Sequence, residues 1–436
     1  MSPSDTRTAV IDPIPARGPA TAFGGPATAF GDDLFVLVRE YRGEARPVAC
    51  ANLVDWLLSA NTRSLEGVEL FDGLCWRMVG QGIPLWRANL SISTLHPQIM
   101  GIGFRWWRDE GVTQEFRVKH GMERHTDYLE SPMRPAIEQG VTVRYRLEQD
   151  ATALERYPLL RAFRAAGATD YLACPLHAFV GRFRVVTWAS DAPGGFTEAQ
   201  VAAIQAILPA IAAVVESNAL RKMSAILLDT YLGRTIGRHI LDGEIIRGQG
   251  RRLRAALMAV DLRGFTNLAD RMPGDELIQL LDDYFDAVAA AVHGQRGEIL
   301  KFVGDGVLAI FEPDGRSEQE AVRDALAAGH ELLRRIDTTN NNRAAVGQEL
   351  IAIGVGLHLG EVIYGNVGAV DRLDYTAIGP AVNLVCRLEG LTKRLGRPLL
   401  VSESFAQAHG GQLLSLGFQP VRGISEPQEI FAPPEA

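Results

Sequence analysis

The sequence contains few cysteines, and no two of them lie close together along the chain. Cys50, Cys75, Cys174 and Cys386 are the only four in 436 residues, with no C-x-x-C spacing. Such a set indicates neither a disulfide framework nor a zinc site and predicts a cytoplasmic protein. Positive charge is not in excess either, because 44 Lys and Arg stand against 52 Asp and Glu. A nucleic-acid-coating protein is therefore not expected, whereas the charge balance does not exclude a local basic site for a small phosphate ligand.

Long apolar runs are also missing. The most apolar stretch, around residues 207–215, is too short to span a bilayer and contains Pro209. The N-terminus has no basic segment followed by an apolar one, which is the pattern of an export signal. We therefore expect no membrane span.

The chain begins with a biased segment and continues into a mixed region. Residues 1 to about 33 are rich in Ala, Pro, Gly and Thr and repeat P-A-T-A-F-G. This composition predicts a disordered tail, which we extend to residue 48. Residues 49–216 mix helical and extended patterns and predict an α/β domain. Its clearest elements are a helix around 54–58, extended stretches at 86–94 and 179–189, and a helix from 198 to 215.

All six tryptophans fall in residues 49–216, where they either fill the core or line an apolar ligand pocket. The domain ends with the turn D-A-P-G-G-F-T-E at 191–198, followed by the last helical pattern. A strand, a glycine turn and a final helix in this order resemble the end of a GAF-type sensor domain. The resemblance implies a sensor for an unknown small-molecule or protein signal and identifies no ligand residue.

Residues 217–250 predict a helical linker. Leu220, Met223, Leu227 and Tyr231 form a narrow apolar stripe suited to a partner helix. The Gly- and Arg-rich segment after residue 230 predicts short broken pieces. The linker is either a solvated connection or a signalling element between a sensor and an output domain.

Residues 251–436 show the clearest pattern, with strands and helices in the order βαββαβ plus additions. That order predicts a ferredoxin-like core, α+β in class, with its helices mainly on one face of the sheet. The expected elements are an apolar strand at 253–262, a helix at 275–292, strands at 298–303 and 307–311, a helix at 317–336, an Asn-rich loop near 339–342, strands at 350–358 and 361–367, a helix at 380–395, and strands near 399 and 428.

Two aspartates stand where strands of this domain end. Asp261 closes the run A-L-M-A-V-D, and Asp305 lies in the hairpin turn of K-F-V-G-D-G-V-L-A-I-F. Taken alone, each is an ordinary turn residue. Together they also suit a hard divalent cation, because magnesium is commonly held by one or two carboxylates with phosphates and water.

Three motifs in register then resemble the signature segments of class III adenylate/guanylate cyclases. They are V-D-L-R-G-F-T at 260–266, the hairpin at 301–311, and D-Y-T-A-I-G-P-A-V-N-L-V-C-R-L at 374–388. The resemblance covers the C-terminal domain. It implies that Asp261 and Asp305 hold two Mg²⁺ or Mn²⁺ ions, which activate the ribose 3′-hydroxyl and clamp the triphosphate.

The same resemblance assigns the purine-reading residues. Lys301 matches the lysine that reads adenine, since an ammonium donor suits an acceptor ring nitrogen. Thr376 stands where some members have Asp and one large bacterial subgroup has Thr. A guanylate cyclase is expected to have Glu near 301 and Cys near 376, so ATP is favoured over GTP as the substrate.

Asn383 and Arg387 lie four residues apart on one expected helix face and match the family's transition-state pair. Taken alone, Arg387 forms a surface salt bridge with a neighbour such as Glu389. The sequence departs from the family at Ile424, where many members have a lysine for the terminal phosphates. Arg422 is a candidate replacement.

The family's active site forms between two catalytic domains, so one chain carrying both residue sets implies a homodimer with two sites. Three alternatives are a catalytically silent cyclase-like nucleotide-binding module, a guanylate cyclase, and a chain whose N-terminal sensor is the main actor. A diguanylate cyclase is disfavoured, because its Gly-Gly-(Asp/Glu)-Glu-Phe hairpin is absent.

Overall fold

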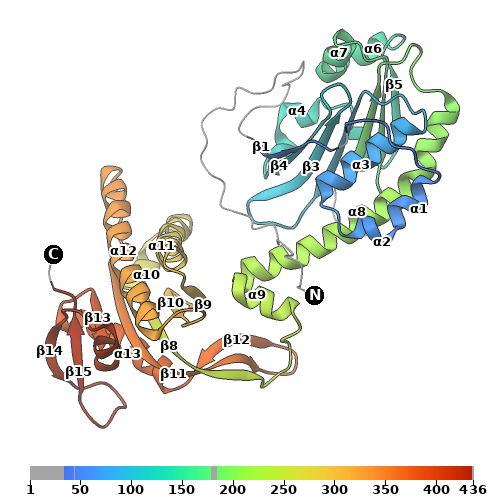
Figure 1. The fold of residues 1–436 in the computed structure, drawn as a ribbon. Helices are drawn as coiled ribbons and strands as arrows, with labels where there is room; N and C mark the ends of the chain where they lie inside the picture. Colours follow the sequence, from blue (N-terminus) through green and yellow to red (C-terminus); the bar gives the residue numbers. More distant parts are fainter. Residues whose placement is uncertain (1–33, 44, 178–183, 435–436) are drawn as a thin grey trace. The chain divides into compact units, whose positions relative to one another are not determined.

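The computed structural model describes residues 34–43, 45–177 and 184–434 (Figure 1). The chain forms two compact units that divide between Ile226 and Leu227. The predicted disordered tail lies outside the described residues as far as residue 33, and so does the first part, 179–183, of the extended stretch predicted at 179–189. The remaining part of that stretch lies in a strand, Arg184–Ser190.

The N-terminal unit is built on a seven-stranded sheet in which all neighbouring strands are antiparallel. The strand order is β1-β4-β3-β2-β7-β6-β5. The strands are β1 (Phe35–Tyr41), β2 (Arg87–Ser93), β3 (Ile99–Trp107), β4 (Val112–Lys119), β5 (Val143–Arg146), β6 (Asp170–Pro175) and β7 (Arg184–Ser190). The predicted strand at 86–94 is confirmed as β2.

Strand β1 corrects the predicted end of the tail at residue 48. Residues Phe35–Tyr41 pair with β4 along the edge of the sheet. Their sequence, FVLVREY, is rich in β-branched and aromatic residues, which favour an extended backbone. The boundary is wrong because the composition of the long biased segment masked this short strand.

Helices cover both faces of this sheet (Figure 1). They are α1 (Leu53–Leu58), α2 (Ala60–Arg63), α3 (Gly67–Gly80), α4 (Thr126–Leu129), α5 (Arg134–Gln139), α6 (Ala151–Arg156), α7 (Pro158–Ala165) and α8 (Glu198–Leu232), with a 3₁₀ turn at Met122–Arg124. Helices α3 and α8 pack on one face and form the main apolar core with β2, β3 and β7. Helices α5, α6 and α7 pack a second cluster on the other face.

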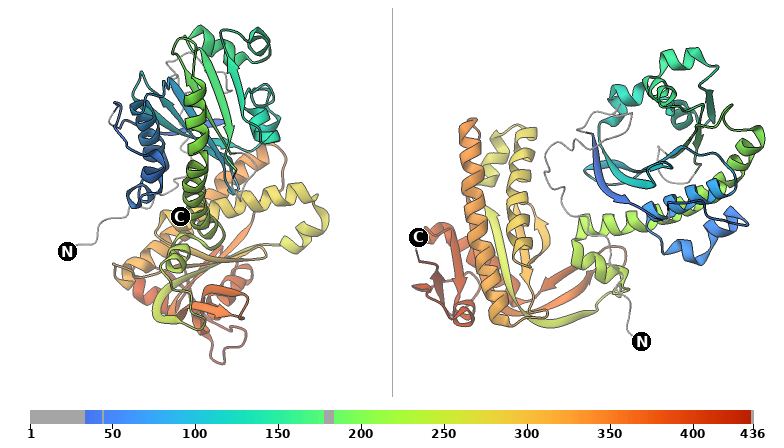
Figure 2. Two further views of the ribbon diagram at one scale, coloured as in Figure 1. Left: turned by 90° about the vertical axis from the view of Figure 1, so that its right-hand side faces the viewer. Right: turned by 45° about the horizontal axis from the view of Figure 1, so that its top comes forward.

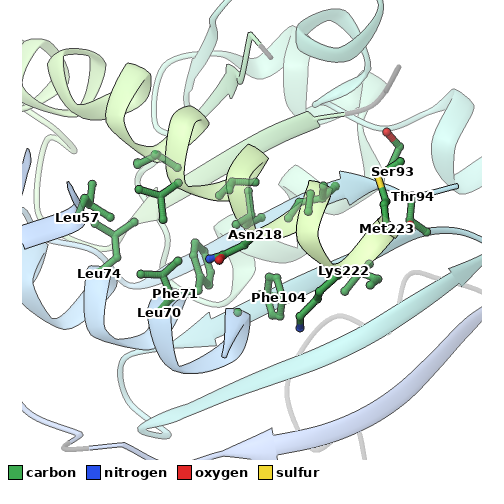
Figure 3. Close-up of a pocket in the computed structure, with 18 of the residues that line it drawn as sticks. Leu57, Leu70, Phe71, Leu74, Ser93, Thr94, Phe104, Asn218, Lys222 and Met223 are labelled. Carbon is green, nitrogen blue, oxygen red and sulfur yellow. The ribbon is translucent and has the colours of Figure 1, made fainter. Parts of the chain in front are cut away.

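The tryptophans of the main core are packing residues. Trp106 and Trp188 are fully buried, and Trp76 stacks edge-on against Trp106 with ring centroids 5.0 Å apart. A cavity of about 60 Å³ lies between α3, α8 and the sheet (Figure 3). Its described lining is aliphatic apart from Phe71, Phe104 and a few polar groups and includes no tryptophan.

Helix α8 joins the predicted helix at 198–215 and its predicted continuation over 217–232 into one helix, with Pro209 inside it. Among the described residues it is the one helix long and apolar enough to cross a membrane by length and composition, and 39% of that apolar window is buried. The predicted continuation over 217–232 and the break after it are confirmed. The apolar stripe is shared between two environments, since Met223 is buried whereas Leu220 and Tyr231 are exposed.

The C-terminal unit contains a mostly antiparallel eight-stranded sheet. Seven strands follow the order β14-β15-β13-β11-β8-β10-β9, and β12 pairs with β11. They are β8 (Gly250–Leu262), β9 (Glu298–Val303), β10 (Gly306–Phe311), β11 (Ile353–Gly368), β12 (Leu373–Ile378), β13 (Leu399–Ser402), β14 (Leu414–Gln419) and β15 (Gln428–Ala432). The parallel pair is β11 with β13.

The helices of this unit are α9 (Arg234–Leu241), α10 (Phe265–Arg271), α11 (Gly274–Gly294), α12 (Glu318–Ala345), α13 (Pro380–Leu395) and α14 (Glu403–His409). Helices α11 and α12 lie side by side on one face of the sheet (Figure 2, right). The predicted βαββαβ order is confirmed by β8, α11, β9, β10, α12 and β11. The helices are not confined mainly to one face, because α9 and α13 pack on the opposite face.

Two boundaries differ from the prediction for identifiable reasons. The strands predicted at 350–358 and 361–367 are one strand, β11, because it pairs continuously with β8 from Ile353 to Gly365 and Gly360 stays extended. The Asn-rich segment is helical, not a loop. The Asn340 side chain binds the backbone N–H and C=O of Ile351, so the segment that suggested a loop instead fastens α12 to the chain before β11.

Candidate functional site

Asp261 and Asp305 lie at one edge of the C-terminal sheet. Asp261 is the last but one residue of β8, and Asp305 sits with Gly304 in the two-residue loop between β9 and β10. Strands β8 and β10 are paired neighbours, with Val260 opposite Val307. The register therefore brings a strand end and a hairpin loop together, as the sequence predicted.

The two carboxyl groups are close enough to share a proton. Burial, the hydrogen bond with Asp305 and the negative charge of Asp305 together raise the pKa of Asp261 to about 6. The charge of Asp305 thus makes ionisation of Asp261 costly until a cation neutralises it.

Two further residues, which the sequence did not assign to this site, lie near the two aspartates: Glu389 and Tyr284. We call the group formed by Asp261, Asp305 and Glu389 the acidic site. Glu389 of α13 has its pKa raised to about 7 by burial and then by the charge of Asp261, partly opposed by Arg263. Tyr284 of α11 is fully buried, and its hydroxyl has no hydrogen-bond partner in the described chain. Burial and the two aspartates raise the Tyr284 pKa. Glu389 therefore belongs to the acidic site rather than to a surface salt bridge with Arg387.

The position of Glu389 depends on the close packing of α13 against β11. Strand β11 contains Gly354 and Gly356 at this contact, and a Cβ on Gly356 would lie 2.6 Å from the backbone nitrogen of Glu389. The helix starts at Gly379, whose φ of +144° suits glycine, followed by Pro380 in the first turn. The two glycines of β11 therefore allow α13 to pack directly against the strand, and Gly379 and Pro380 fix where the helix begins.

The acidic site fits a hard divalent cation in its donor chemistry. Its donors are carboxylate oxygens with mutual repulsion, which a cation would relieve. Among the described residues no three Asp, Glu, His or Cys side chains form a ready metal cage. A cation here would therefore depend on two carboxylates, with water and substrate phosphates as the remaining ligands.

The two residues that the sequence assigns to the purine lie on separate strands, Lys301 on β9 and Thr376 on β12. Lys301 of β9 lies within electrostatic range of the Cys386 thiol on α13, whose pKa is raised mainly by burial and lowered by Lys301. Thr376 of β12 is opposite Gly365 of β11 and is buried. Its hydroxyl has no hydrogen-bond partner among the residues that the structure describes. A buried hydroxyl without a partner costs free energy and is available to a ligand.

Asn383 and Arg387 lie on α13 as expected, four residues apart on one face. Asn383 is exposed and Arg387 half-buried. A Cβ on Gly423 would lie 3.2 Å from an Arg387 guanidinium nitrogen, so the loop at 421–424 packs against this side chain. Ile424 packs into an apolar cluster, whereas Arg422 is exposed beside that loop.

Within one chain, these residues form two groups. Asp261, Asp305 and Glu389 interact with one another, and Cys386 lies near both Lys301 and Asp261. The described interactions do not connect Thr376, Asn383 or Arg387 to the aspartates.

Comparisons with known proteins match this part of the chain. Residues 251–407 match the family described as adenylate and guanylate cyclase catalytic domain. Adenylate cyclase from Anabaena cylindrica is 35% identical over 155 residues, 35% of this chain and 30% of that protein. Adenylate cyclase 1 from Rhizobium meliloti is 34% identical over 148 residues, 33% of this chain and 22% of that protein.

Solved structures are also similar. The adenylyl cyclase CyaB from P. aeruginosa shares 26% identity, with a TM-score of 0.40 over 43% of this chain and 97% of that one. The chain spans less than a third of the length of the two curated relatives named above. The GAF-like interpretation of the N-terminal unit stays a prediction. The family match, the relatives and the three motifs agree for the C-terminal unit: residues 251–407 form an adenylate/guanylate cyclase catalytic domain.

Proposed function

We propose that the chain is an adenylate cyclase that converts ATP to 3′,5′-cyclic AMP and pyrophosphate as a cytoplasmic homodimer, under control of its N-terminal unit. The observation that carries the proposal is the pairing of Asp261 with Asp305 at the sheet edge of a cyclase domain. The relatives named adenylate cyclase support the choice of reaction.

Asp261 and Asp305 are the residues that would hold two Mg²⁺ or Mn²⁺ ions. When bound, such ions supply an acidified ribose 3′-hydroxyl and neutralise charge on the triphosphate. In the reaction, the 3′-hydroxyl gives its proton to solvent water and its oxygen bonds to the α-phosphorus, while the bond from that phosphorus to the pyrophosphate oxygen breaks and pyrophosphate leaves. Both aspartates are half-buried, so each carboxylate keeps an open side for a cation and its phosphate ligands.

The purine contacts favour ATP. The Lys301 ammonium donates to an acceptor ring nitrogen of adenine, and the partnerless Thr376 hydroxyl accepts from the adenine amino group. Guanine offers a ring N–H where Lys301 needs an acceptor, and the Thr376 hydroxyl could donate to the guanine carbonyl, so Lys301 provides the discrimination. GTP is the alternative substrate, and its use would require another residue to supply the acceptor.

Asn383 and Arg387 stabilise the transition state in this proposal. Asn383 binds the ribose, and the Arg387 guanidinium contacts oxygens of the α-phosphate as negative charge builds up there. The exposed Arg422 belongs to the loop that packs against Arg387. In this proposal it contacts the terminal phosphates in place of the family's lysine.

A homodimer brings the two groups together. Apolar side chains beside the hairpin loop of Asp305 are exposed in the single chain: Phe302 is 53% exposed and Val303 62%. Phe302 and Val303 immediately precede the hairpin loop of Asp305, so a partner that covers them would also close the acidic edge. In this arrangement, the aspartates of one protomer face the purine and transition-state residues of its partner.

The first experiment measures cyclic nucleotide formation by the purified chain from ATP and from GTP, each with Mg²⁺ and with Mn²⁺. Asp305→Asn should abolish the product, whereas Asp314→Asn, an exposed aspartate in the next loop, should not. Cyclic AMP that depends on Asp305 supports the proposal. Cyclic GMP alone would indicate the guanylate cyclase, and nucleotide binding without product would indicate the silent module.

A further inference from the structure

The N-terminal sheet has a polar stripe on a face that helices cover. In β2, residues Ala88 and Leu90 belong to the main core, whereas Arg87, Asn89 and Ser91 point to the opposite face, toward α4, α5 and α7. A sheet covered on both faces usually has apolar residues on both. These side chains instead line a cavity of about 100 Å³.

Two arginines lie side by side in this cavity. Arg87 is opposite Trp107 and Asn89 is opposite Arg105 in the β2–β3 register, which makes the two arginines diagonal neighbours on one face. They are 8% and 9% exposed. Like charges this close and this buried repel each other strongly unless an anion lies between or beside them.

Aromatic rings hold both guanidinium groups. Arg87 lies 4.8 Å from the ring centroid of Trp107 and 4.9 Å from that of Phe163. Arg105 lies 4.3 Å from the ring of Phe116 and 5.2 Å from that of Phe35. Stacking contacts the flat faces of a guanidinium and leaves its N–H edge to a ligand that approaches in the plane.

The cavity holds more positive than negative charge. Asp127 is the one carboxylate among the described lining residues, and its own neighbour is His125, 3.4 Å away. No hydrogen bond or ion pair joins Arg87 to an acid in the described chain. Burial lowers the Arg87 pKa to about 10, opposed by Tyr171 and Glu110, and burial and the charge of Arg87 lower that of Arg105 to about 9. Both arginines stay charged at neutral pH, so the described lining residues carry two positive charges and one negative charge.

We propose that this cavity binds a small organic monocarboxylate whose body is apolar. One carboxylate balances the excess charge and matches the planar N–H edge of Arg87. Asn89, Ser91 and Thr187 offer further polar contacts at the sheet, and the far wall is apolar, formed by Met100, Met122, Met133 and Ile137. The cavity between α3 and α8 shown in Figure 3 has an almost wholly apolar lining and no comparable pair of charges.

Isothermal titration of the full-length chain tests the site with three probes that share a phenyl ring: benzoate, benzamide and phenyl phosphate. Benzoate should bind, the neutral amide should bind at least about tenfold more weakly, and phenyl phosphate, which is mostly a dianion at neutral pH, should also bind more weakly. The assay needs no nucleotide turnover, so its result does not depend on the proposed cyclase activity.

Variants then assign the binding to Arg87. Arg87→Gln should weaken benzoate binding by about 10- to 100-fold, the loss expected for a charge-assisted contact. Arg77→Gln is the matched control, because Arg77 is also stacked on a tryptophan, 4.2 Å from the Trp56 ring, but lies outside the cavity. Thermal unfolding checks that the variants fold. If Arg87→Gln does not, Arg87→Lys keeps the charge, loses the planar fork and should still weaken binding about tenfold.

Several results would overturn the proposal. They are no benzoate binding at concentrations up to about 10 mM, equal binding by benzamide, and equal losses in the Arg87 and Arg77 variants. Phenyl phosphate binding as tightly as benzoate would replace the carboxylate with a phosphate ligand.

Discussion

The carboxyl groups of Asp261 and Asp305 approach closely enough to share a proton, although one comes from a strand end and the other from a hairpin loop. Glu389 adds a third acid whose pKa rises to about 7. Without a cation, the fold keeps Asp261 and Glu389 partly protonated at a pH where the unfolded chain would ionise them. This relationship makes the site measurable through stability as well as activity.

The first prediction concerns pH and metal. The pKa values of Asp261 and Glu389 are raised from 3.8 to about 6 and from 4.5 to about 7, so the folded chain holds more protons than the unfolded chain between about pH 4 and 7. Stability of the metal-free protein should therefore fall as the pH rises through this range. Added Mn²⁺ or Mg²⁺ should raise the melting temperature more at pH 7.5 than at pH 5.

Other titrating groups cancel in this comparison. His358 has its pKa lowered to about 4 by burial, which gives the opposite slope, but it does so with and without metal. Thermal unfolding with EDTA and with Mn²⁺ across the pH range isolates the metal-dependent difference. Asp261→Asn should remove most of that difference, and an equal metal effect in wild type and variant would contradict the assignment.

The second prediction concerns the shared site. Inactive Asp261→Ala and Arg387→Ala chains, mixed and allowed to exchange, should form hybrid dimers with one intact site, restoring about a quarter of the wild-type activity. Asp261→Ala mixed with Asp305→Ala is the control, because both aspartates serve the same site and neither hybrid site is complete. Recovery in both mixtures, or in neither, would refute the proposed arrangement.

The third prediction concerns the partnerless hydroxyl of Thr376. Thr376→Val keeps the shape of this buried side chain and removes a hydroxyl that has no protein partner. The free energy of unfolding should therefore be unchanged or slightly higher, while kcat/KM for ATP falls about tenfold. Lower stability without a change in kcat/KM would show that the hydroxyl is structural.

The fourth prediction concerns the purine contact of Lys301. Lys301→Glu should lower kcat/KM for ATP by about 10- to 100-fold, since a charged donor is replaced by an acceptor. The ratio of GTP to ATP use should rise, because a carboxylate can accept from the guanine ring N–H. Competition of the two nucleotides in one reaction measures the ratio directly. An unchanged ratio would remove Lys301 from the purine site.

The fifth prediction tests the packing that places Glu389. Gly356→Ala puts a methyl group against the α13 backbone, 2.6 Å from the Glu389 nitrogen, and should destabilise the domain by about 1–3 kcal/mol. Gly390→Ala is the matched control, since its added methyl group meets nothing within 4 Å and alanine favours the helix. Chemical denaturation compares the two variants. Similar stability in both would mean that the close contact of α13 with β11 is easily relaxed.

The sequence predicted those parts of the structure that depend on local pattern. The strand ending at Asp261, the hairpin of Asp305 and the limits of α13 follow from apolar periodicity and from glycine and proline at the boundaries. Strand β1 was missed because biased residues surround it. Strand β12, with Thr376, was missed because its role depends on pairing with β11.

Residues whose importance comes from contacts across the fold could not be predicted in this way. Glu389 looks like a surface partner of Arg387 until α13 rests on β11 and turns it toward the aspartates. Arg87 and Arg105 are separate arginines in the sequence, and only the β2–β3 register makes them neighbours. Neither relationship leaves a periodic signal.

The β9–β10 hairpin carries both Lys301 and Asp305 on one rigid pair of strands joined by a two-residue loop. In the proposed dimer, Lys301 serves one active site and Asp305 the other. A shift of this hairpin would disturb purine recognition in one site and metal binding in its twin at the same moment. The two sites of such a dimer could not be switched independently, because a signal that moved one hairpin would change both active sites.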